Sequence, residues 1–440
     1  MKNFIKSLLI IIICSFIIFF LNDYISKDYS MKVFSDKLSY DLVYKGIHEA
    51  RDFIYDEENN CYIAYKDRIQ FVGNDGKSYN IIKDEKLDIF SMEYYKNKLY
   101  FSSNTSIFEL DLRSNQLSEL IKDLPNWGDY NKSLIRVSED LLYISIGAST
   151  NSGVVGEDNL WTEIYMSGHD ISPYDITLAG MNFGDPKRGA FVAQNSKTLE
   201  EQVISGHCPG NASIIIYNLN TEDSATFAWG IRNIKGMDFN SRSKLIASVG
   251  GMENRGLRPI KGDLDYIYEI KSKKWYGWPD YSGGDPVSSP KFIGTDNKIV
   301  LPILKNPPNT NPPAPLYQHK SLNSLESIAI DKNGDIGNID EIYYYDMEEK
   351  AIYSLDNDLT LCKVIKLEKK GNIASMKFYN KNLYILNEAD GTLYKIYNES
   401  NINDSIKFYK IIFWILILFI FVLVCYFIYT VVKSNKSKLN

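Results

Sequence analysis

The chain has 440 residues, enough for one large domain or two ordinary ones between its ends. Its formal net charge is −6, and the central part is more acidic than the whole because seven lysines lie in or beside two hydrophobic ends. An acidic surface repels phosphate backbones, so we expect no nucleic-acid partner. These lysines are Lys2, Lys6, Lys407, Lys410, Lys433, Lys436 and Lys438.

The C-terminal end contains an uncharged apolar run from Ile411 to Val432. As a helix this run spans roughly 33 Å, which is enough to cross the hydrocarbon core of a bilayer. Three lysines and no acid follow it, which places the C-terminus in the cytoplasm. We therefore predict a transmembrane helix and a short basic tail in residues 407–440.

The N-terminal end contains a shorter apolar run, Leu8 to Leu21, preceded by two lysines. A secretory signal peptide has this form but ends in small residues suited to cleavage. Here the run closes with large apolar residues. We expect an uncleaved membrane anchor in residues 1–27, with a cleaved signal peptide as the alternative. Either way, residues 28–406 are predicted to be extracytoplasmic, in a multi-pass cell-membrane protein with both termini cytoplasmic.

A short phrase recurs in the central part: a polar turn, an apolar residue followed by Tyr (once Ile), then a β-branched or aromatic strand. Tyr62 and Tyr100 are 38 positions apart, and Tyr100 and Tyr143 are 43 apart, close to the length of one four-stranded propeller blade. No long helical periodicity appears. The pattern predicts an all-β propeller of about six to eight blades, with six favoured; a pair of β-sandwiches is the alternative. The phrases begin near Asn60, Lys98, Leu142, Lys244 and Asn382.

Two stretches interrupt this repeat. Residues 148–206 are rich in Gly and polar side chains, and residues 306–315 are rich in Pro. Loops this long in a compact domain are usually functional or disordered. We expect both to lie over one face of the propeller. Away from the apolar ends the chain has three cysteines, Cys61, Cys208 and Cys362, which we predict to be buried small apolar residues, with one disulfide among them as the alternative.

Four motifs resemble, in order, those of the glucose/sorbosone dehydrogenase family, which comprises sugar dehydrogenases dependent on pyrroloquinoline quinone (PQQ). Gly230 to Phe239 is similar to the family's GxRNPxGxxF, with Ile234 at the Pro position. Trp275 to Pro279 resembles NYGWP, Leu142 to Gly147 resembles LYVSVG, and Gly391 to Ile396 resembles GxIYRI. The resemblance covers roughly residues 40–397 and implies a six-bladed propeller.

The resemblance also implies a site. Arg232 would stabilise charge on the quinone oxygen during hydride transfer, and Asn233 and Trp278 would lie beside the cofactor. The backbone carbonyls of Gly277 and Pro279 would bind Ca²⁺, a hard cation that prefers oxygen ligands. The alternative is that Arg232 is an internal ion-pair partner and the glycines serve the turns of the propeller.

The sequence departs from the family at the catalytic base, which is a His in a phrase like HNGGRI. The matching stretch runs from Tyr130 to Val137 and puts Tyr130 at the His position. Tyr is protonated at neutral pH and is a poor base. A shift of one residue would put the carboxylate of Asp129 there instead.

A second departure lies in the last blade, where the family's GRxRDV supplies arginines to the anionic cofactor. Here the stretch from Gly371 to Met376 has Asn372 and Ala374 in their places. Much of the charge pairing with a carboxylate-rich cofactor would be lost. Of the four histidines, His169 and His207 lie closest to the expected face, and we expect surface or structural roles for both, as for His48 and His319.

Two functional hypotheses follow. The first is a membrane-tethered quinoprotein that oxidises a sugar or polyol with PQQ and Ca²⁺. The second is a non-catalytic propeller that binds a glycan, a cell-envelope polymer or a protein.

Overall fold

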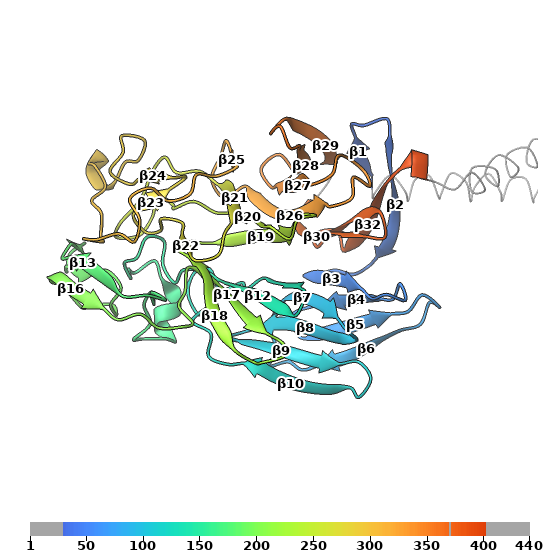
Figure 1. Cartoon of the computed structure of the whole chain (residues 1–440), viewed down its shortest axis with the longest axis horizontal. Coiled ribbons are helices and arrows are strands. Elements are labelled where there is room, and N and C mark those ends of the chain that lie inside the picture. The colour runs from blue at the N-terminus through green and yellow to red at the C-terminus, as the bar shows by residue number, and fades with distance from the viewer. Residues whose placement is uncertain (1–29, 369–370, 402–440) are drawn as a thin grey trace, which may run out of the picture.

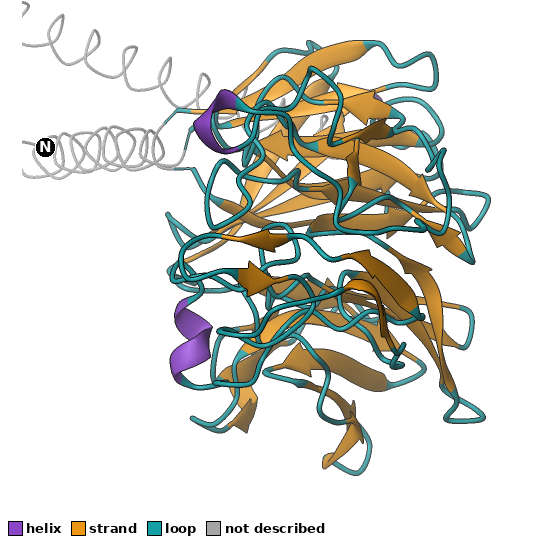
Figure 2. Cartoon of the chain, turned by 90° about the vertical axis from the view of Figure 1, so that its left-hand side faces the viewer, coloured by secondary structure: helices purple, strands orange, loops and turns teal. Residues whose placement is uncertain are grey.

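The computed structural model describes residues 30–368 and 371–401, and Figure 1 shows them arranged as a ring of antiparallel sheets. The first strand of each of six sheets contacts the first strands of the two neighbouring sheets, which closes the ring. The chain is therefore a six-bladed β-propeller, as the repeat and the resemblance predicted. Strands and loops make up nearly all of the described fold (Figure 2), and its helices are single 3₁₀ turns.

The blades follow one another along the chain, with the strands of each in order from the centre of the ring outward. The first blade contains β3 (Asp52–Tyr55), β4 (Cys61–Ala64), β5 (Arg68–Val72) and β6 (Ser78–Lys83), and the second contains β7 (Ile89–Tyr95), β8 (Lys98–Ser103), β9 (Ser106–Asp111) and β10 (Gln116–Ile121). The third contains β11 (Ile135–Ser138), β12 (Leu141–Ile146), β17 (Ser213–Asn218) and β18 (Ser224–Trp229), with the short parallel strand β22 (Lys274–Trp275) at its edge.

The last three blades complete the circle. The fourth blade contains β19 (Ile234–Phe239), β20 (Leu245–Val249), β21 (Tyr266–Ile270) and β25 (Tyr317–Gln318). The fifth contains β26 (Leu325–Asp331), β27 (Glu341–Asp346), β28 (Ala351–Leu355) and β29 (Leu361–Leu367), with β1 (Met31–Val33) outside. The sixth contains β30 (Ile373–Tyr379), β31 (Asn382–Asn387), β32 (Thr392–Asn398) and β2 (Leu38–Lys45).

The recurring phrases of the sequence form the second strands of five blades. These strands are β4, β8, β12, β20 and β31, and most of their residues are buried because both faces of a blade pack against neighbouring blades. The sixth second strand, β27, is fully buried as well. Its Ile342-Tyr343 pair is a further copy of the phrase, beyond the five that the sequence pattern indicated.

The ring is closed by pairing between the two ends of the described chain. Strand β2, from the N-terminal part, is the outermost strand of the last blade and pairs antiparallel with β32, so that Leu38 lies opposite Asn398. Figure 1 shows the two strands side by side. The backbone N–H of Glu399 also donates to the carbonyl of Lys37 (2.9 Å). The start of β2 and the end of β32 therefore lie on one face, the face at which the innermost strands end.

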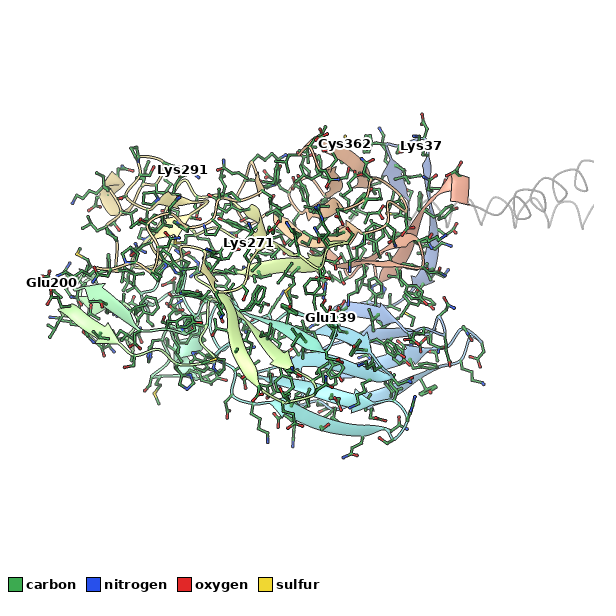
Figure 3. The ribbon with its side chains drawn as sticks, in the orientation of Figure 1. Lys37, Glu139, Glu200, Lys271, Lys291 and Cys362 are labelled. Atoms are coloured by element: carbon green, nitrogen blue, oxygen red, sulfur yellow. The ribbon has the colours of Figure 1, made fainter. Side chains whose placement is uncertain are left out.

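The opposite face, at which the innermost strands begin, carries the long loops, as expected. They contain η1 (Leu160–Glu163), η2 (Thr295–Asn297) and three two-stranded sheets. We call this the loop face. In Figure 3, Glu200 on the projecting β16 and Lys37 beside β2 lie at opposite ends of the view. The small sheets are β13 (Ile176–Ala179) with β16 (Glu200–Ile204), β14 (Asn182–Phe183) with β15 (Arg188–Gly189), and β23 (Tyr281–Ser282) with β24 (Asp285–Pro286).

Apolar clusters fill the spaces between blades, and a separate cluster packs beneath the loops of the loop face. Cys61 is buried as predicted, but Cys208 and Cys362 are exposed, so the prediction was wrong for these two. The two predicted membrane segments lie outside the described residues. Within 30–368 and 371–401, no helix has the length and apolarity needed to cross a bilayer.

Closure by β2 gives a test of the fold. Tyr40 lies opposite Ile396 and packs edge-on against Tyr394, with 6.1 Å between ring centroids. Tyr40→Pro removes this ring contact, and proline fixes φ near −65° and so distorts the extended backbone of the strand. We expect Tyr40→Pro to lower the thermal unfolding midpoint markedly. Asp41→Ala is the control, because the Asp41 side chain is 53% exposed and pairs with Lys395 at the surface; an equal loss from both variants would contradict the closure.

Candidate functional site

Two of the sequence motifs meet on the loop face. Strand β18 leads into Gly230, and β22 runs beside it, with Trp229 opposite Trp275. The backbone N–H of Trp278 donates to the Gly230 carbonyl (2.9 Å). Gly230 has a φ of +70°, and a Cβ there would lie 2.4 Å from the Trp275 ring, so only glycine fits. The two motifs are thus adjacent because the Trp275 ring packs directly against Gly230.

Arg232 follows Gly230 and is 2% exposed. Its Nε donates to the Asn151 carbonyl (3.1 Å), and its Nη2 donates to Asn151 Oδ1 (2.9 Å) and Glu253 Oε1 (2.5 Å). Its Nη1 donates to the carbonyls of Gly250 and Gly251. Every nitrogen of the guanidinium is therefore occupied by an acceptor of the chain itself.

Tyr130 and Arg232 are in direct contact. Nη2 of Arg232 donates to the Tyr130 hydroxyl, and the guanidinium lies 4.1 Å from the centroid of the Tyr130 ring. The hydroxyl donates to Glu253 Oε1 (2.7 Å) and accepts from Arg255 Nη2 (2.7 Å). The Tyr130 hydroxyl is thus surrounded by two guanidinium groups and a carboxylate. Its catalytic role stays a prediction.

Asp129, the alternative base, is also enclosed by donors. Oδ2 accepts from Arg255 Nη2 (2.7 Å) and Asn159 Nδ2 (2.9 Å), and Oδ1 accepts from Trp161 Nε1 (2.9 Å). These three donors occupy both oxygens of the Asp129 carboxylate. The arrangement suits a structural role, in which Asp129 holds Asn159 and Trp161 in place.

Burial and neighbouring charges act against each other at the two arginines. Burial lowers the pKa of Arg232 to about 10, although the Glu253 carboxylate raises it. Burial also lowers the pKa of Arg255, but Asp129 and Glu253 outweigh it and raise that pKa above the ordinary value. Both guanidiniums stay charged at neutral pH.

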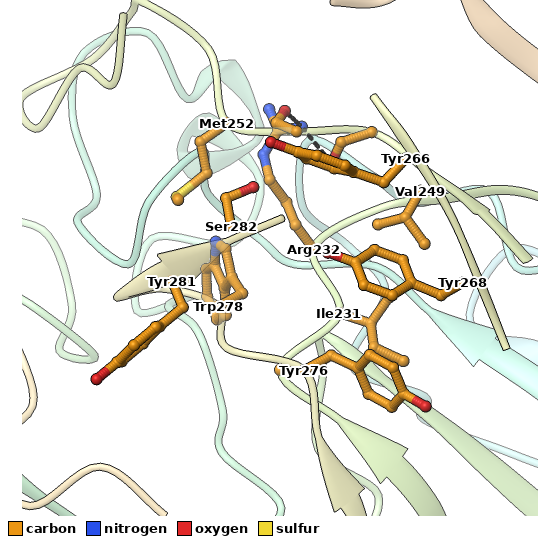
Figure 4. A pocket seen from close by; sticks show the side chains of 13 residues that line it. Ile231, Arg232, Val249, Met252, Tyr266, Tyr268, Tyr276, Trp278, Tyr281 and Ser282 are labelled. Carbon is orange, nitrogen blue, oxygen red and sulfur yellow. Dashed lines mark hydrogen bonds between the residues drawn. The ribbon is translucent and has the colours of Figure 1, made fainter. Parts of the chain in front are cut away.

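The space beside Arg232 is small. The cavity has a volume of about 20 Å³, room for about one water molecule. Figure 4 shows aromatic side chains filling the space around Arg232. A planar cofactor of three fused rings does not fit here without rearrangement of these side chains. Among the residues that line the cavity are Arg232, Met252, Tyr266, Tyr268, Tyr276 and Trp278.

The carbonyls expected to bind Ca²⁺ already have partners in the chain. The Gly277 carbonyl accepts from the backbone N–H groups of Asp280 (2.9 Å) and Tyr281 (2.8 Å). The Pro279 carbonyl accepts from Nη1 of Arg258 (2.9 Å), which is buried and paired with Asp280 (2.8 Å). A guanidinium therefore stands beside the carbonyl at which the resemblance implies a metal ion.

The fit of the implied cofactors is therefore poor. Ca²⁺ takes six to eight oxygen ligands, and among residues 30–368 and 371–401 no cluster of three or more acidic, His or Cys side chains could hold a metal ion. Trp278 is buried, donates its Nε1–H to the Asn151 carbonyl (3.1 Å) and packs on Phe191. It serves the packing of the loop face rather than an open cofactor surface.

The remaining predicted residues lie on the same face but are not gathered around one ligand. The backbone carbonyl of Asn233 accepts from Gly250 N–H (2.8 Å). Asn372 precedes β30 in another blade, where its side chain donates to Glu388. His169 and His207 contact backbone carbonyls within their own loops, those of Ser167 and Pro209.

Sequence reasoning missed three charged residues of this site, Glu253, Arg255 and Arg258. All three lie in the segment after β20, which begins with two glycines and contains three acidic and three basic residues up to Asp265. A cluster of charged residues so close to a family motif could have indicated that they belong to the site. Their partners are far away in the sequence, so the ion pairs themselves were not visible.

The comparisons with solved structures agree with the fold. The calcium structure of a carbohydrate-active enzyme of family AA12 from Trichoderma reesei matches with a TM-score of 0.58 and 12% identity, covering 84% of this chain and 98% of the other. The holo PQQ domain of pyranose dehydrogenase from Coprinopsis cinerea gives 0.55 and 12%, covering 84% and 97%. The PQQ-bound aldose sugar dehydrogenase from Streptomyces coelicolor gives 0.50 and 12%, covering 83% and 99%.

No protein-family model matches the sequence, and no curated protein matches it either. The fold is a six-bladed β-propeller, as the resemblance predicted, and it is similar to the propellers of solved PQQ-dependent sugar dehydrogenases. At these identities the likeness establishes the architecture.

Asp170 holds the loop that supplies Asn151 to Arg232. It is buried, and its Oδ1 accepts from the Ser149 N–H (2.6 Å) and its Oδ2 from the Thr150 hydroxyl (2.5 Å). Burial without a cationic partner raises the pKa of Asp170 to about 7, although these donors lower it. The folded state therefore binds a proton at a pH where the unfolded chain has released it.

This shift predicts a pH dependence of stability. Since the folded pKa exceeds the unfolded one, the contribution of Asp170 is complete below about pH 4 and is lost as the pH rises through 7. The slope is at most about 1.4 kcal/mol per pH unit. Asp170→Asn cannot titrate, so its free energy of unfolding, measured by denaturant titration from pH 4 to 8, should vary less than that of the wild type. An unchanged profile would show that Asp170 is ionised throughout.

Proposed function

We propose that this chain is a membrane-anchored, extracytoplasmic propeller that keeps the sugar dehydrogenase architecture without its redox chemistry. In this proposal it binds a partner through its loop face. The observation that carries the proposal is the enclosure of Arg232, whose guanidinium is occupied by Asn151, Glu253 and backbone carbonyls. A group meant to stabilise charge on a substrate needs a free donor directed at it.

Two further observations support the proposal. The Tyr130 hydroxyl is engaged by Arg255 and Glu253, and a Tyr is a poor base at neutral pH. Arg258 takes the Pro279 carbonyl that a Ca²⁺ ion would need. The fold alone does not decide whether the chain keeps the redox chemistry, because one architecture serves many functions.

Anchoring at both ends is consistent with the closure of the ring. The start of β2 lies beside the end of β32, with Ser39 Oγ donating to Glu399. The basic residues flanking each apolar run support cytoplasmic termini.

The redox part of the proposal predicts that the full-length protein retains neither cofactor. After incubation with PQQ and Ca²⁺, gel filtration should separate the quinone absorbance from the protein, and sugars should not reduce an artificial electron acceptor. A PQQ-dependent aldose sugar dehydrogenase treated in parallel is the positive control. We expect the triple variant Tyr130→His, Asn372→Arg, Ala374→Arg to remain inactive as well, because Arg232 is still enclosed. Stoichiometric quinone retention or robust turnover by the wild type would refute the proposal.

The topological part predicts that both termini are cytoplasmic. An alkaline phosphatase fusion after Asn440 should be inactive, because this reporter folds only outside the cytoplasm. A fusion inserted in the exposed β11–β12 turn at Glu139 should be active and serves as the control. Activity after Asn440 would overturn the C-terminal assignment, and a mature chain beginning near Asn22 would identify the first segment as a signal peptide.

A further inference from the structure

Several large apolar side chains are exposed together on the loop face. In and just after η1, Leu160 is 74% exposed, Ile164 and Met166 are each 79% exposed, and Tyr165 is 41% exposed. Single exposed apolar residues are common, but a group of four within seven positions is not explained by packing. Such a group on an extracytoplasmic surface indicates a binding site for another molecule.

The structure holds this segment in place. Asn159 and Trp161 both donate to Asp129, and a further turn follows η1, in which the backbone N–H of Tyr165 donates to the Trp161 carbonyl (2.9 Å). The Tyr165 ring stacks on Trp127, with 5.7 Å between centroids and 25° between planes. The exposed side chains are therefore presented on a fixed backbone, which lowers the entropic cost of binding.

A groove of about 460 Å³ lies beside the segment, and we call it the η1 groove. Trp127 and Tyr165 belong to its wall, and the loop between β8 and β9 contributes Thr105. Because Thr105 precedes β9 and Trp127 precedes β11, the groove opens on the loop face. Its lining residues are Thr105, Asp123, Leu124, Trp127, Tyr165, Met166, Ser167, Gly168, His169 and Ile171.

The charge around the groove is negative. Residues 148–186 contain six acidic residues and neither Lys nor Arg. Asp170 is buried, and Asp158 and Glu157 pair with Arg255 and Arg188. Glu163 on η1 and Asp123 in the groove are exposed. The site therefore combines apolar contact surface with carboxylates at its edge.

We infer that the η1 groove binds a cationic, amphipathic segment of a protein partner. Apolar side chains of the partner would pack against Met166, Ile164 and Tyr165, and its Lys or Arg residues would approach Asp123 and Glu163. The inference rests on the proposed function, since it names the partner class for the loop face. It adds a location away from Arg232.

The chemistry of the groove favours a peptide over a glycan. The exposed Leu160, Ile164 and Met166 side chains offer neither hydrogen bonds for sugar hydroxyls nor an aromatic face for stacking. The two aromatic rings of the wall, Trp127 and Tyr165, stack on each other, so one face of each ring is already covered. Apolar anchors with a charged rim are the usual features of grooves that bind amphipathic helices. The carboxylates at the edge select a cationic segment over an anionic one by long-range attraction.

The test uses the full-length protein in nanodiscs of phosphatidylcholine, which carries no net charge. The probe is a short fluorescein-labelled peptide of Leu and Lys at helical period, and binding is measured by fluorescence anisotropy, with empty nanodiscs subtracted. We expect Met166→Glu, at a residue that lines the groove, to weaken binding about tenfold or more. Leu199→Glu is the matched control, because Leu199 is 74% exposed on the same loop excursion but does not line the groove. It should leave binding unchanged.

A charge exchange separates specific docking from general adhesion. The double variant Asp123→Lys, Glu163→Lys should lose affinity for the Lys peptide and gain affinity for the corresponding Glu peptide, with the same thermal unfolding midpoint as the wild type. Equal effects of Leu199→Glu and Met166→Glu, or no exchange of peptide preference, would overturn the inference. Binding of soluble peptidoglycan fragments that is lost in Met166→Glu would overturn it in favour of a glycan. If the wild-type protein binds neither the peptide nor PQQ, the inference about the η1 groove is wrong, but the proposed function is not contradicted.

Discussion

The buried positive charge of Arg232 is the constraint on which the loop face depends. A guanidinium removed from water must be surrounded by acceptors, since an unpaired charge in a protein interior costs several kcal/mol. Here the acceptors come from three separate segments: Asn151 in the long excursion, Glu253 in the loop after β20, and the Tyr130 hydroxyl before β11. The charge therefore brings together parts of the chain that the propeller strands alone would not hold.

The side chains that pair with Arg232 form further ion pairs, and these reach outward to the surface of the loop face. Glu253 also binds Arg255, and Arg255 binds Asp129, which accepts hydrogen bonds from Asn159 and Trp161 beside η1. One chain of charge-assisted hydrogen bonds thus connects the centre of the face to the segment with the exposed apolar side chains. In a dehydrogenase such donors would be held ready for a substrate. In this chain the guanidinium groups and carboxylates pair with one another and hold the loop face in place.

Much of the fold was readable from the sequence because it depends on local patterns. The apolar-Tyr phrase marks the second strand of a blade, where both faces are buried, and its spacing matches the blade length. Gly230 and Gly147 keep their motifs recognisable for steric reasons: a Cβ at Gly147 would lie 2.1 Å from the Tyr130 carbonyl oxygen. The motifs also predicted that Tyr130 and Arg232 lie together. The rest was hidden because it depends on distant pairs: nothing local to Arg258 indicates that it donates to the Pro279 carbonyl, and Asn151 lies in a stretch without repeat or motif.

The direction of the strands relates the loop face to the closure of the ring. In a blade of four antiparallel strands, the first and third run the same way, so β32 ends on the face at which β30 ends. Strand β2 pairs antiparallel with β32 and therefore begins on that same face. The ring is thus closed by a strand that starts on the face opposite to Arg232 and η1. Because the closing pair needs only a short connection there, the long loops between strands are confined to the other face, where the buried charges hold them together.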